Sequence, residues 1–385
     1  MMDATPLYDL DPLARLMLVG VLVAVLPLAW VWMRHRHAPV GQRLQALTWV
    51  TLFLTFDLVL FGAFTRLTDS GLGCPDWPGC YGAVSPVGAH ADIAAAQQAM
   101  PTGPVTFPKA WIEMIHRYLA TGVGVLIIVL LAGSWAERHR LKVSLMWPVM
   151  TLVWVCVQGA FGALTVTMKL FPAIVTLHLL GGLALLALLR VQSVAYARPS
   201  LAPPMPRREH LWLWLTFGLV WVQVALGGWV STNYAVLACT DFPACQGSWW
   251  PNMDWANGFT IWRHLGMTGD GSALPFAALT AIHYAHRLAA YVVLAALVVT
   301  AWLLYRLPGW RSESRWLLAL SGLQLLTGLS NIVLGWPLLA AVMHTGGAAA
   351  LVLVLTGALA RRHFETAASS AQAPLPTPRF SAQIS

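Results

Sequence analysis

Histidines and cysteines recur in this chain as two sets with nearly the same spacing. The recurring pairs are His116 with His286, His178 with His344, Cys74 with Cys239, and Cys80 with Cys245, at offsets of 170, 166, 165 and 165 residues. Each half therefore contributes two histidines that come from different apolar runs. Two imidazoles that face each other across a helical bundle can occupy both axial positions of a haem iron. The spacing predicts two such iron sites, one in each half of a duplicated unit.

A single histidine in a membrane helix is often only a packing residue, so the ligand interpretation depends on the repetition. All four histidines are expected within about six residues of the outer end of their span, or within roughly 10 Å of the membrane boundary. A zinc site is not favoured, because the spans place no set of carboxylates or thiolates beside these histidines. The residue four positions after each histidine, on the same helix face, is small, which suits a flat macrocycle. These residues are Ala120, Gly182, Ala290 and Ala348.

The two halves differ beside the first histidine of each pair. Glu113 stands three residues before His116, whereas His283 stands three residues before His286, and each shares a helix face with its histidine. A carboxylate in the outer leaflet is costly unless it has a task, so one site is predicted to hold an acid–base group beside its iron. The alternative is that Glu113 caps the start of its helix, where a negative charge suits the helix dipole.

Three arginines lie near the predicted sites. Arg117 and Arg287 each follow a histidine, and Arg66 ends the span before the first cysteine loop. Guanidinium groups pair well with carboxylates such as haem propionates. The alternative is that these arginines anchor the helix ends at the membrane interface.

Both cysteine pairs have C-x5-C spacing and lie in long loops between spans. In an oxidising compartment each pair, Cys74 with Cys80 and Cys239 with Cys245, can close as a disulfide that ties down its loop. Free thiols or a copper site are the alternatives. The chain has no CxxCH motif for covalent attachment of haem.

The composition places these residues in a membrane. Hydrophobic residues make up 58% of the chain and charged residues 10%, which is more apolar surface than a soluble domain of this length can bury. Apolar runs of about 20 residues, the length that crosses a bilayer, occur at roughly 13–33, 46–66, 111–133, 144–167, 172–192, 211–232, 280–304, 316–335 and 338–360. The sequence therefore predicts an all-α polytopic protein with nine transmembrane helices.

Internal repetition divides these spans into two pseudo-symmetric four-helix bundles, an eight-helix core, with one extra helix in front. The predicted divisions are an extra N-terminal transmembrane helix and cytoplasmic loop over residues 1–45, an N-terminal bundle over 46–192, a cytoplasmic linker over 193–210, a C-terminal bundle over 211–362 and a disordered cytoplasmic tail over 363–385.

Lysine and arginine concentrate in the loops on one side of the predicted membrane. This asymmetry predicts an outward-facing N-terminus, outward-facing cysteine loops and a cytoplasmic C-terminus. The net charge of +8 is explained by this topology, and nucleic-acid binding is not expected. The first span follows acidic residues, the reverse of a signal peptide, and no organelle-type leader is evident, so a bacterial plasma membrane is expected.

Five motifs, in this order, resemble the haem A synthase family of cytochrome oxidase assembly proteins. They are "TRLTDSGLGCPDWPGCYG", "EMIHR", "TLHLLGG", "HYAHR" and "MHTGG". The resemblance covers residues 46–362 and leaves out the extra first span. It implies an enzyme that oxidises the C8 methyl of haem O to the formyl group of haem A through successive hydroxylations and loss of water.

The resemblance also implies roles for particular residues. A haem b cofactor would be ligated by His286 and His344, and the substrate haem by His116 and His178, with Glu113 as the functionally important acid. The pairs Cys74–Cys80 and Cys239–Cys245 would be disulfides. The implied partners are haem O and haem A, the lipid bilayer, haem O synthase, other cytochrome oxidase assembly proteins and an electron donor.

Two other functions would use the same histidines. A dihaem electron carrier of the quinol-oxidising type would hold two haems b and make no modified haem. A haem-delivery chaperone would hold substrate-like haem without turnover. The Glu113/His283 difference and the cysteine loops favour the synthase over both.

Overall fold

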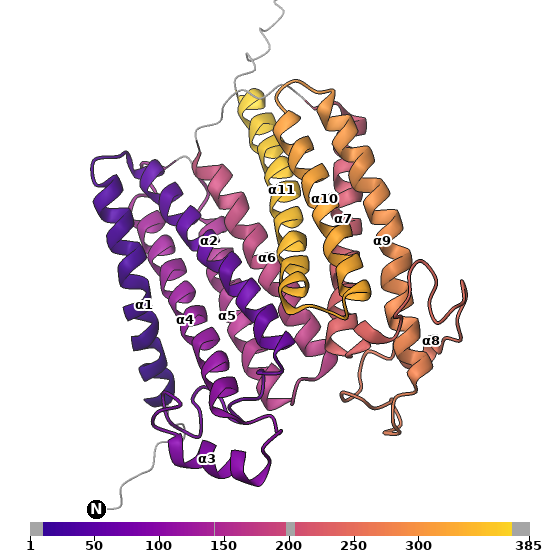
Figure 1. Cartoon of the computed structure of the whole chain (residues 1–385). Helices are drawn as coiled ribbons and strands as arrows, with labels where there is room; N and C mark the ends of the chain where they lie inside the picture. Colours follow the sequence, from indigo (N-terminus) through magenta and orange to yellow (C-terminus); the bar gives the residue numbers. More distant parts are fainter. Residues whose placement is uncertain (1–10, 142, 198–204, 372–385) are drawn as a thin grey trace, which may run out of the picture.

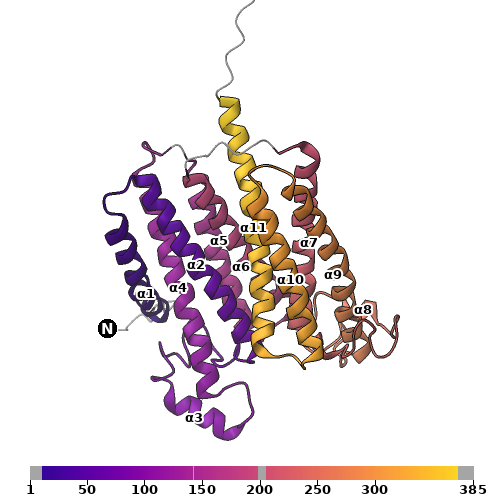
Figure 2. The same cartoon turned by 45° about the horizontal axis from the view of Figure 1, so that its top comes forward.

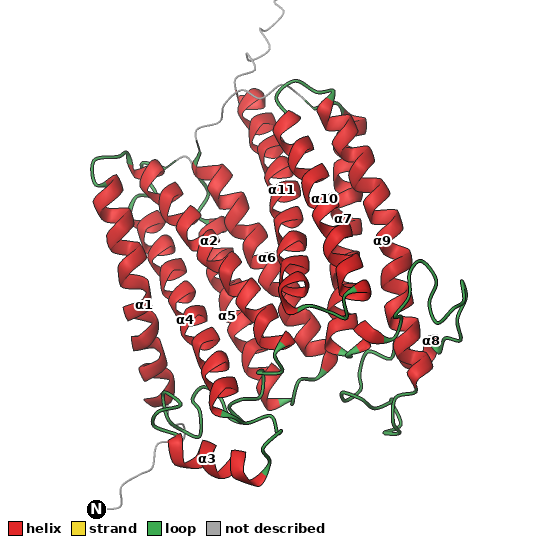
Figure 3. Cartoon of the chain, in the orientation of Figure 1, coloured by secondary structure: helices red, strands yellow, loops and turns green. Residues whose placement is uncertain are grey.

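The computed structural model describes residues 11–141, 143–197 and 205–371, and its elements are helices joined by loops (Figure 3). In chain order the helices are α1 (Asp11–His35), α2 (Val40–Leu67), α3 (His90–Ala99), α4 (Phe107–Ala136), α5 (Met146–Thr167), α6 (Pro172–Tyr196), α7 (Arg207–Thr232), the 3-10 turn η1 (Ala235–Leu237), α8 (Trp255–Gly258), α9 (Phe276–Tyr305), α10 (Arg311–Val333) and α11 (Leu338–Ala371). Within the described residues nine helices are long and apolar enough to cross a membrane, which confirms the predicted spans. The short helices α3 and α8 were not predicted.

The long helices form two groups of four that lie side by side (Figures 1 and 2). Helices α2, α4, α5 and α6 pack around one another, as do α7, α9, α10 and α11. The groups meet where α2 and α6 contact α11, and where α6 contacts α7. The extra helix α1 packs on the outer side of the first group, mainly against α4.

Small residues allow α1 to approach α4 closely. A Cβ atom at Gly20 of α1 would lie 2.8 Å from the Cβ of Thr121, and one at Gly122 of α4 would lie 2.7 Å from a methyl of Val23. Membrane helices associate through such close packing, because lipid tails give no hydrophobic force between helices. The extra helix is therefore fitted to this bundle.

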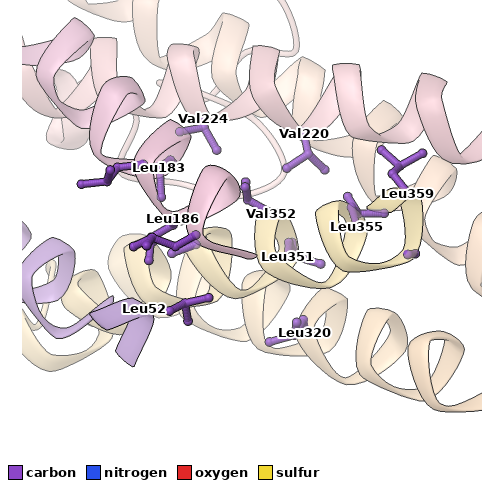
Figure 4. Close-up of a cluster of buried hydrophobic side chains, with 14 of the residues drawn as sticks. Leu52, Leu183, Leu186, Val220, Val224, Leu320, Leu351, Val352, Leu355 and Leu359 are labelled. Carbon is purple, nitrogen blue, oxygen red and sulfur yellow. The ribbon is translucent and has the colours of Figure 1, made fainter. Parts of the chain in front are cut away.

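Buried aliphatic side chains fill the contact between the two groups. Figure 4 shows Leu52 of α2 and Leu186 of α6 on one side, with Val224 of α7 and Val352 of α11 facing them. The cluster continues along α11 through Leu355 and Leu359. This continuous core fixes the two groups relative to each other, and with them the histidines on α4, α6, α9 and α11.

The helix ends refine several predicted boundaries. Helices α4 and α9 begin at Phe107 and Phe276, about one turn earlier than the hydropathy pattern predicted. Thr106 caps the first turn of α4, and α9 follows Pro275 without a side-chain cap. As a result His116 and His286 lie nine and ten residues into their helices, deeper than the expected six. Helix α11 extends through Ala371, so residues 363–371 are helical, and 372–385 lie outside the described residues. The predicted linker over 193–210 contains the end of α6 and the start of α7, and 198–204 lie outside the described residues.

The long loops gather at one end of the molecule. Helices α3 and α8 lie at the bottom of Figure 1, whereas α11 ends at the top. The first cysteine loop connects α2 to α3, and the second follows η1 and leads to α8. Each loop therefore lies at one end of its group of helices. The first histidine-bearing helix of the group, α4 or α9, begins at that same end.

Candidate functional site

The histidine pair of the second group has the spacing of two ligands that share one iron. The ring centroids of His286 on α9 and His344 on α11 are 6.4 Å apart, with an angle of 78° between the ring planes. A metal–imidazole nitrogen bond of about 2.0 Å, plus about 1.1 Å from nitrogen to ring centre, places two such centroids about 6 Å apart. The observed separation therefore fits bis-histidine ligation of one iron atom.

Polar neighbours orient both rings of this pair. Thr327 Oγ1 lies 2.9 Å from Nδ1 of His344, and the same hydroxyl donates its proton to the carbonyl of Leu323 at 2.7 Å. With its own proton on the Leu323 carbonyl, this oxygen can accept Nδ1–H of His344, the tautomer that leaves Nε2 free for a metal. The side-chain amide of Gln223 lies 3.1 Å from Nδ1 of His286 and donates to the His286 carbonyl at 3.1 Å.

The first group places His116 on α4 and His178 on α6, the helices that match α9 and α11 of the second group. Phe61 of α2 lies nearly parallel to the His116 ring, with centroids 6.3 Å apart and a 13° angle between planes. Nδ1 of His178 is buried and has no hydrogen-bond partner. The two predicted pairs therefore differ in their polar surroundings.

Each histidine ring lies against a glycine of a neighbouring helix. A Cβ atom would lie 3.0 Å from the His116 ring at Gly62, 3.4 Å from His178 at Gly162, 3.0 Å from His286 at Gly227 and 3.4 Å from His344 at Gly328. An added Cβ would push against the ring at Gly62 and Gly227 and would just touch it at Gly162 and Gly328. The sequence analysis missed these glycines and singled out small residues on the histidines' own helices. Their offsets of 165 and 166 residues match the repeat and could have identified them.

Glu113 is buried beside His116, with 4% of its surface exposed. Its Oε2 accepts the backbone N–H of Cys74 at 2.8 Å, and its Oε1 accepts from Arg117 at 2.5 Å. The cap of α4 is Thr106, whose side chain accepts the N–H of Lys109. Glu113 is therefore not a helix cap, and it connects the first histidine site to the cysteine loop.

Both cysteine pairs are disulfide-bonded, Cys74 to Cys80 and Cys239 to Cys245, with Cα atoms 4.9 and 4.8 Å apart. The two loops repeat one turn. Asp76 accepts the N–H groups of Tyr81 and Gly82 at 2.6 and 2.8 Å, and Asp241 accepts those of Gln246 and Gly247 at 2.7 and 2.9 Å. The hydrogen bond from Gly247, with that from Gln246, lowers the pKa of Asp241 below its ordinary value.

The arginines beside the histidines hold these loops. Arg117 donates to the carbonyls of Asp76, Pro78 and Gly79, and Arg287 donates to those of Cys239, Asp241 and Ala244. Nε of Arg287 also contacts Nε2 of His283 at 3.3 Å, so His283 takes the position that Glu113 has in the other half.

Arg66 connects the two groups instead. It donates to the carbonyl of Ser231 and stacks on Tyr234, with its guanidinium carbon 3.9 Å from the ring centre. A role for these three arginines toward propionates stays a prediction.

The donor set suits a porphyrin iron better than a bare ion. Among the described residues there is no group of three or more His, Cys, Asp or Glu side chains that could hold a metal ion. A porphyrin supplies four equatorial nitrogens, so two imidazoles from the protein complete the coordination. The residues present therefore fit a haem in each half.

Comparison with known proteins decides the family. A family model described as "Cytochrome oxidase assembly protein" (COX15-CtaA) matches residues 45–356. The chain belongs to this family. The COX15-CtaA match begins within α2, so α1 lies outside the matched region.

Three relatives of this COX15-CtaA member carry the same name, "Heme A synthase". A protein named "Heme A synthase" from Shewanella oneidensis is 38% identical over 322 residues, which cover 80% of this chain and 94% of the relative. Proteins of the same name from Sphingopyxis alaskensis and Halalkalibacterium halodurans are 29% and 26% identical, over 84% and 74% of this chain and 93% and 86% of the relatives. The family model's match over residues 45–356 includes all four histidines.

Proposed function

We propose that this chain is a membrane oxidoreductase that oxidises the C8 methyl of haem O to a formyl group by successive hydroxylations, giving haem A for cytochrome oxidase. The name of its relatives supports this activity. The observation that carries the proposal is the difference between the halves. A buried carboxylate, Glu113, stands beside one histidine pair, where the other half has His283.

The two histidine pairs have separate tasks in this proposal. His286 and His344 hold a resident haem b. The spacing of their imidazole rings and their polar partners suit permanent ligation. His116 and His178 hold the substrate haem O. The resident haem would supply one-electron chemistry, while the protein supplies binding, orientation and electrostatics.

Glu113 is the catalytic residue of the proposal. Its two oxygens already accept from Cys74 N–H and Arg117, so the carboxylate is fixed in position beside His116. A fixed carboxylate can stabilise positive charge that develops on the substrate, or accept a proton from the oxidised carbon substituent. The loop that Arg117 anchors would hold water away from this position.

The setting of the enzyme follows from charge and hydropathy. We assign it to a bacterial plasma membrane, with the cysteine loops on the periplasmic side and the C-terminus in the cytoplasm. Its proposed partners are haem O synthase, which would deliver the substrate, assembly proteins that receive haem A, and a membrane electron donor.

Pigment extraction from the purified full chain tests the proposal. We expect haem b together with haem A and hydroxylated intermediates when the chain is produced with haem O synthase, with the haems separated by chromatography. The His116→Ala variant should retain haem b and lose the modified haems. Haem b alone in the unaltered chain would instead indicate an electron carrier, and unmodified haem O alone would indicate a delivery protein.

A further inference from the structure

Helices α5 and α10 occupy equivalent places in the two groups, and the residue of α10 that contacts the second histidine has a different counterpart on α5. Gln158 matches Gln324, and Gly162 matches Gly328, at the same 166-residue offset that relates His178 to His344. Within this matched frame, Phe161 of α5 corresponds to Thr327 of α10. The glutamine and the glycine are the same in both helices, whereas the position just before the glycine changes from Phe161 to Thr327.

Thr327 makes the hydrogen bond that orients His344. Its hydroxyl proton goes to the Leu323 carbonyl at 2.7 Å, so its oxygen accepts Nδ1–H of His344 at 2.9 Å. A hydrogen-bonded Nδ1–H fixes the ring and makes Nε2 a stronger donor to a metal. Loss of such a partner typically lowers metal affinity by about 10–100-fold.

The first group lacks this bond. Nδ1 of His178 is buried without a hydrogen-bond partner. Phe161 has no polar side-chain atom, and it packs against an apolar cluster that contains Phe171 and Trp229. A ligand with an unpaired N–H is a weaker donor, and its ring is less firmly held.

We propose that Thr327 makes the second pair a retaining site for haem, and that Phe161 leaves the first pair an exchanging site. The inference rests on the proposed function, in which one haem stays and the other must leave after each turnover. Thr327 and Phe161 act through His344 and His178, so they are positioning residues. One hydrogen bond would thus distinguish the cofactor haem site from the substrate haem site in the two repeated helix groups.

Haem transfer from the purified, haem-loaded full chain to excess apomyoglobin tests the retaining role. Thr327→Val should release the haem of the second pair about 10–100-fold faster, and Thr327→Ser, which keeps the hydroxyl, should release it at nearly the unaltered rate. Ser321→Ala is the matched control, because Ser321 lies buried on the same helix and bonds only its own helix, to Leu317. His344→Ala identifies which kinetic phase belongs to this pair.

Spectroelectrochemistry supplies a second readout that a merely structural role would not move. Thr327→Val should raise the reduction potential of the second-pair haem, because a less electron-rich imidazole stabilises the oxidised iron less. Thr327→Ser, which keeps the hydroxyl, should have nearly the reduction potential of the unaltered chain.

The reciprocal change tests the exchanging role. Phe161→Thr should slow release from the first pair about 10–100-fold relative to Phe161→Val, which has the same size without the hydroxyl. Equal release from these two variants, or unchanged release and potential in Thr327→Val, would overturn the inference. If Thr327→Val does not accumulate, the Phe161 comparison decides. Both assays follow haem itself, so they give the same answer whether or not haem A is made, and product analysis tests the proposed function separately.

Discussion

Replacement of Glu113 by Gln separates chemistry from loop anchoring at the first histidine pair. The carboxylate has two donors, Cys74 N–H and the Arg117 guanidinium, and is almost fully buried. Glutamine keeps the size and one acceptor oxygen, which can serve only one of these donors. The other donor is left unpaired, at a cost of about 1–3 kcal/mol in stability. Arg117 keeps its three loop carbonyls, so the loss stays below the 3–5 kcal/mol expected for a fully isolated buried charge.

The effect on activity should be larger than this structural cost. Loss of a positioned acid–base group typically lowers rates by about 10²–10⁴-fold, or about 3–5 kcal/mol in activation free energy. We therefore expect Glu113→Gln to retain haem and to form haem A at least about 100-fold more slowly. The assay is chromatography of haem O, hydroxylated haem and haem A over time, expressed per mole of folded, haem-loaded protein.

Two further variants make this result interpretable. Asp57→Asn removes another intramembrane carboxylate, one that lies exposed on α2, and should leave the rate within a few-fold of the unaltered chain. Arg117→Lys keeps a cation but loses the forked contacts to the loop. If Glu113 only anchors the loop, Arg117→Lys will reproduce the whole loss. Haem A formation by Glu113→Gln at nearly the unaltered rate would refute a chemical role for the carboxylate.

Three other changes test the loops and the membrane surface. The double change Cys74→Ser and Cys80→Ser removes the disulfide that closes the first cysteine loop and should lower the free energy of unfolding by about 2 kcal/mol. Thermal unfolding measures this loss, and an unchanged melting temperature would contradict it. Because the pKa of Asp241 is lowered in the folded loop, its contribution is fully present above about pH 4 and is lost as the pH falls through the depressed value. Fluorescence of the exposed Trp249 during acid titration should show this transition, which Asp241→Asn should abolish, and a transition that persists in the variant would assign it to another group. Asp57→Leu should stabilise the chain in a bilayer by up to about 3 kcal/mol, the insertion cost of Asp near a helix centre, and no gain would mean that a partner or water solvates the carboxylate.

The sequence predicted the parts of this protein that depend on local pattern. Nine spans followed from hydropathy, because the length of an apolar helix is set by the thickness of the membrane. The histidine pairs followed from spacing, because duplication repeats offsets along the chain whatever the packing. The C-x5-C spacing within each loop predicted the disulfides that the structure shows, Cys74 with Cys80 and Cys239 with Cys245.

Helix starts were predicted less well. Hydropathy placed the outer ends of α4 and α9 about one turn too deep, since Phe107 and Phe276 begin turns that project beyond the apolar run. The Thr106 cap decides the start of α4, and a cap depends on which backbone N–H groups are free.

Other features were decided only by the tertiary structure. Glu113 meets Cys74, and Arg117 meets Gly79, across 39 and 38 residues of chain, so their roles depend on how the loop folds back over α4. The repeat offsets mark the four matched glycines in the sequence, but the rotation of each helix decides that they touch the histidine rings. That rotation is set by side-chain packing between helices, which no single helix encodes. Spacing along the chain therefore determined which residues could bind iron, and packing between helices determined which of them received a partner.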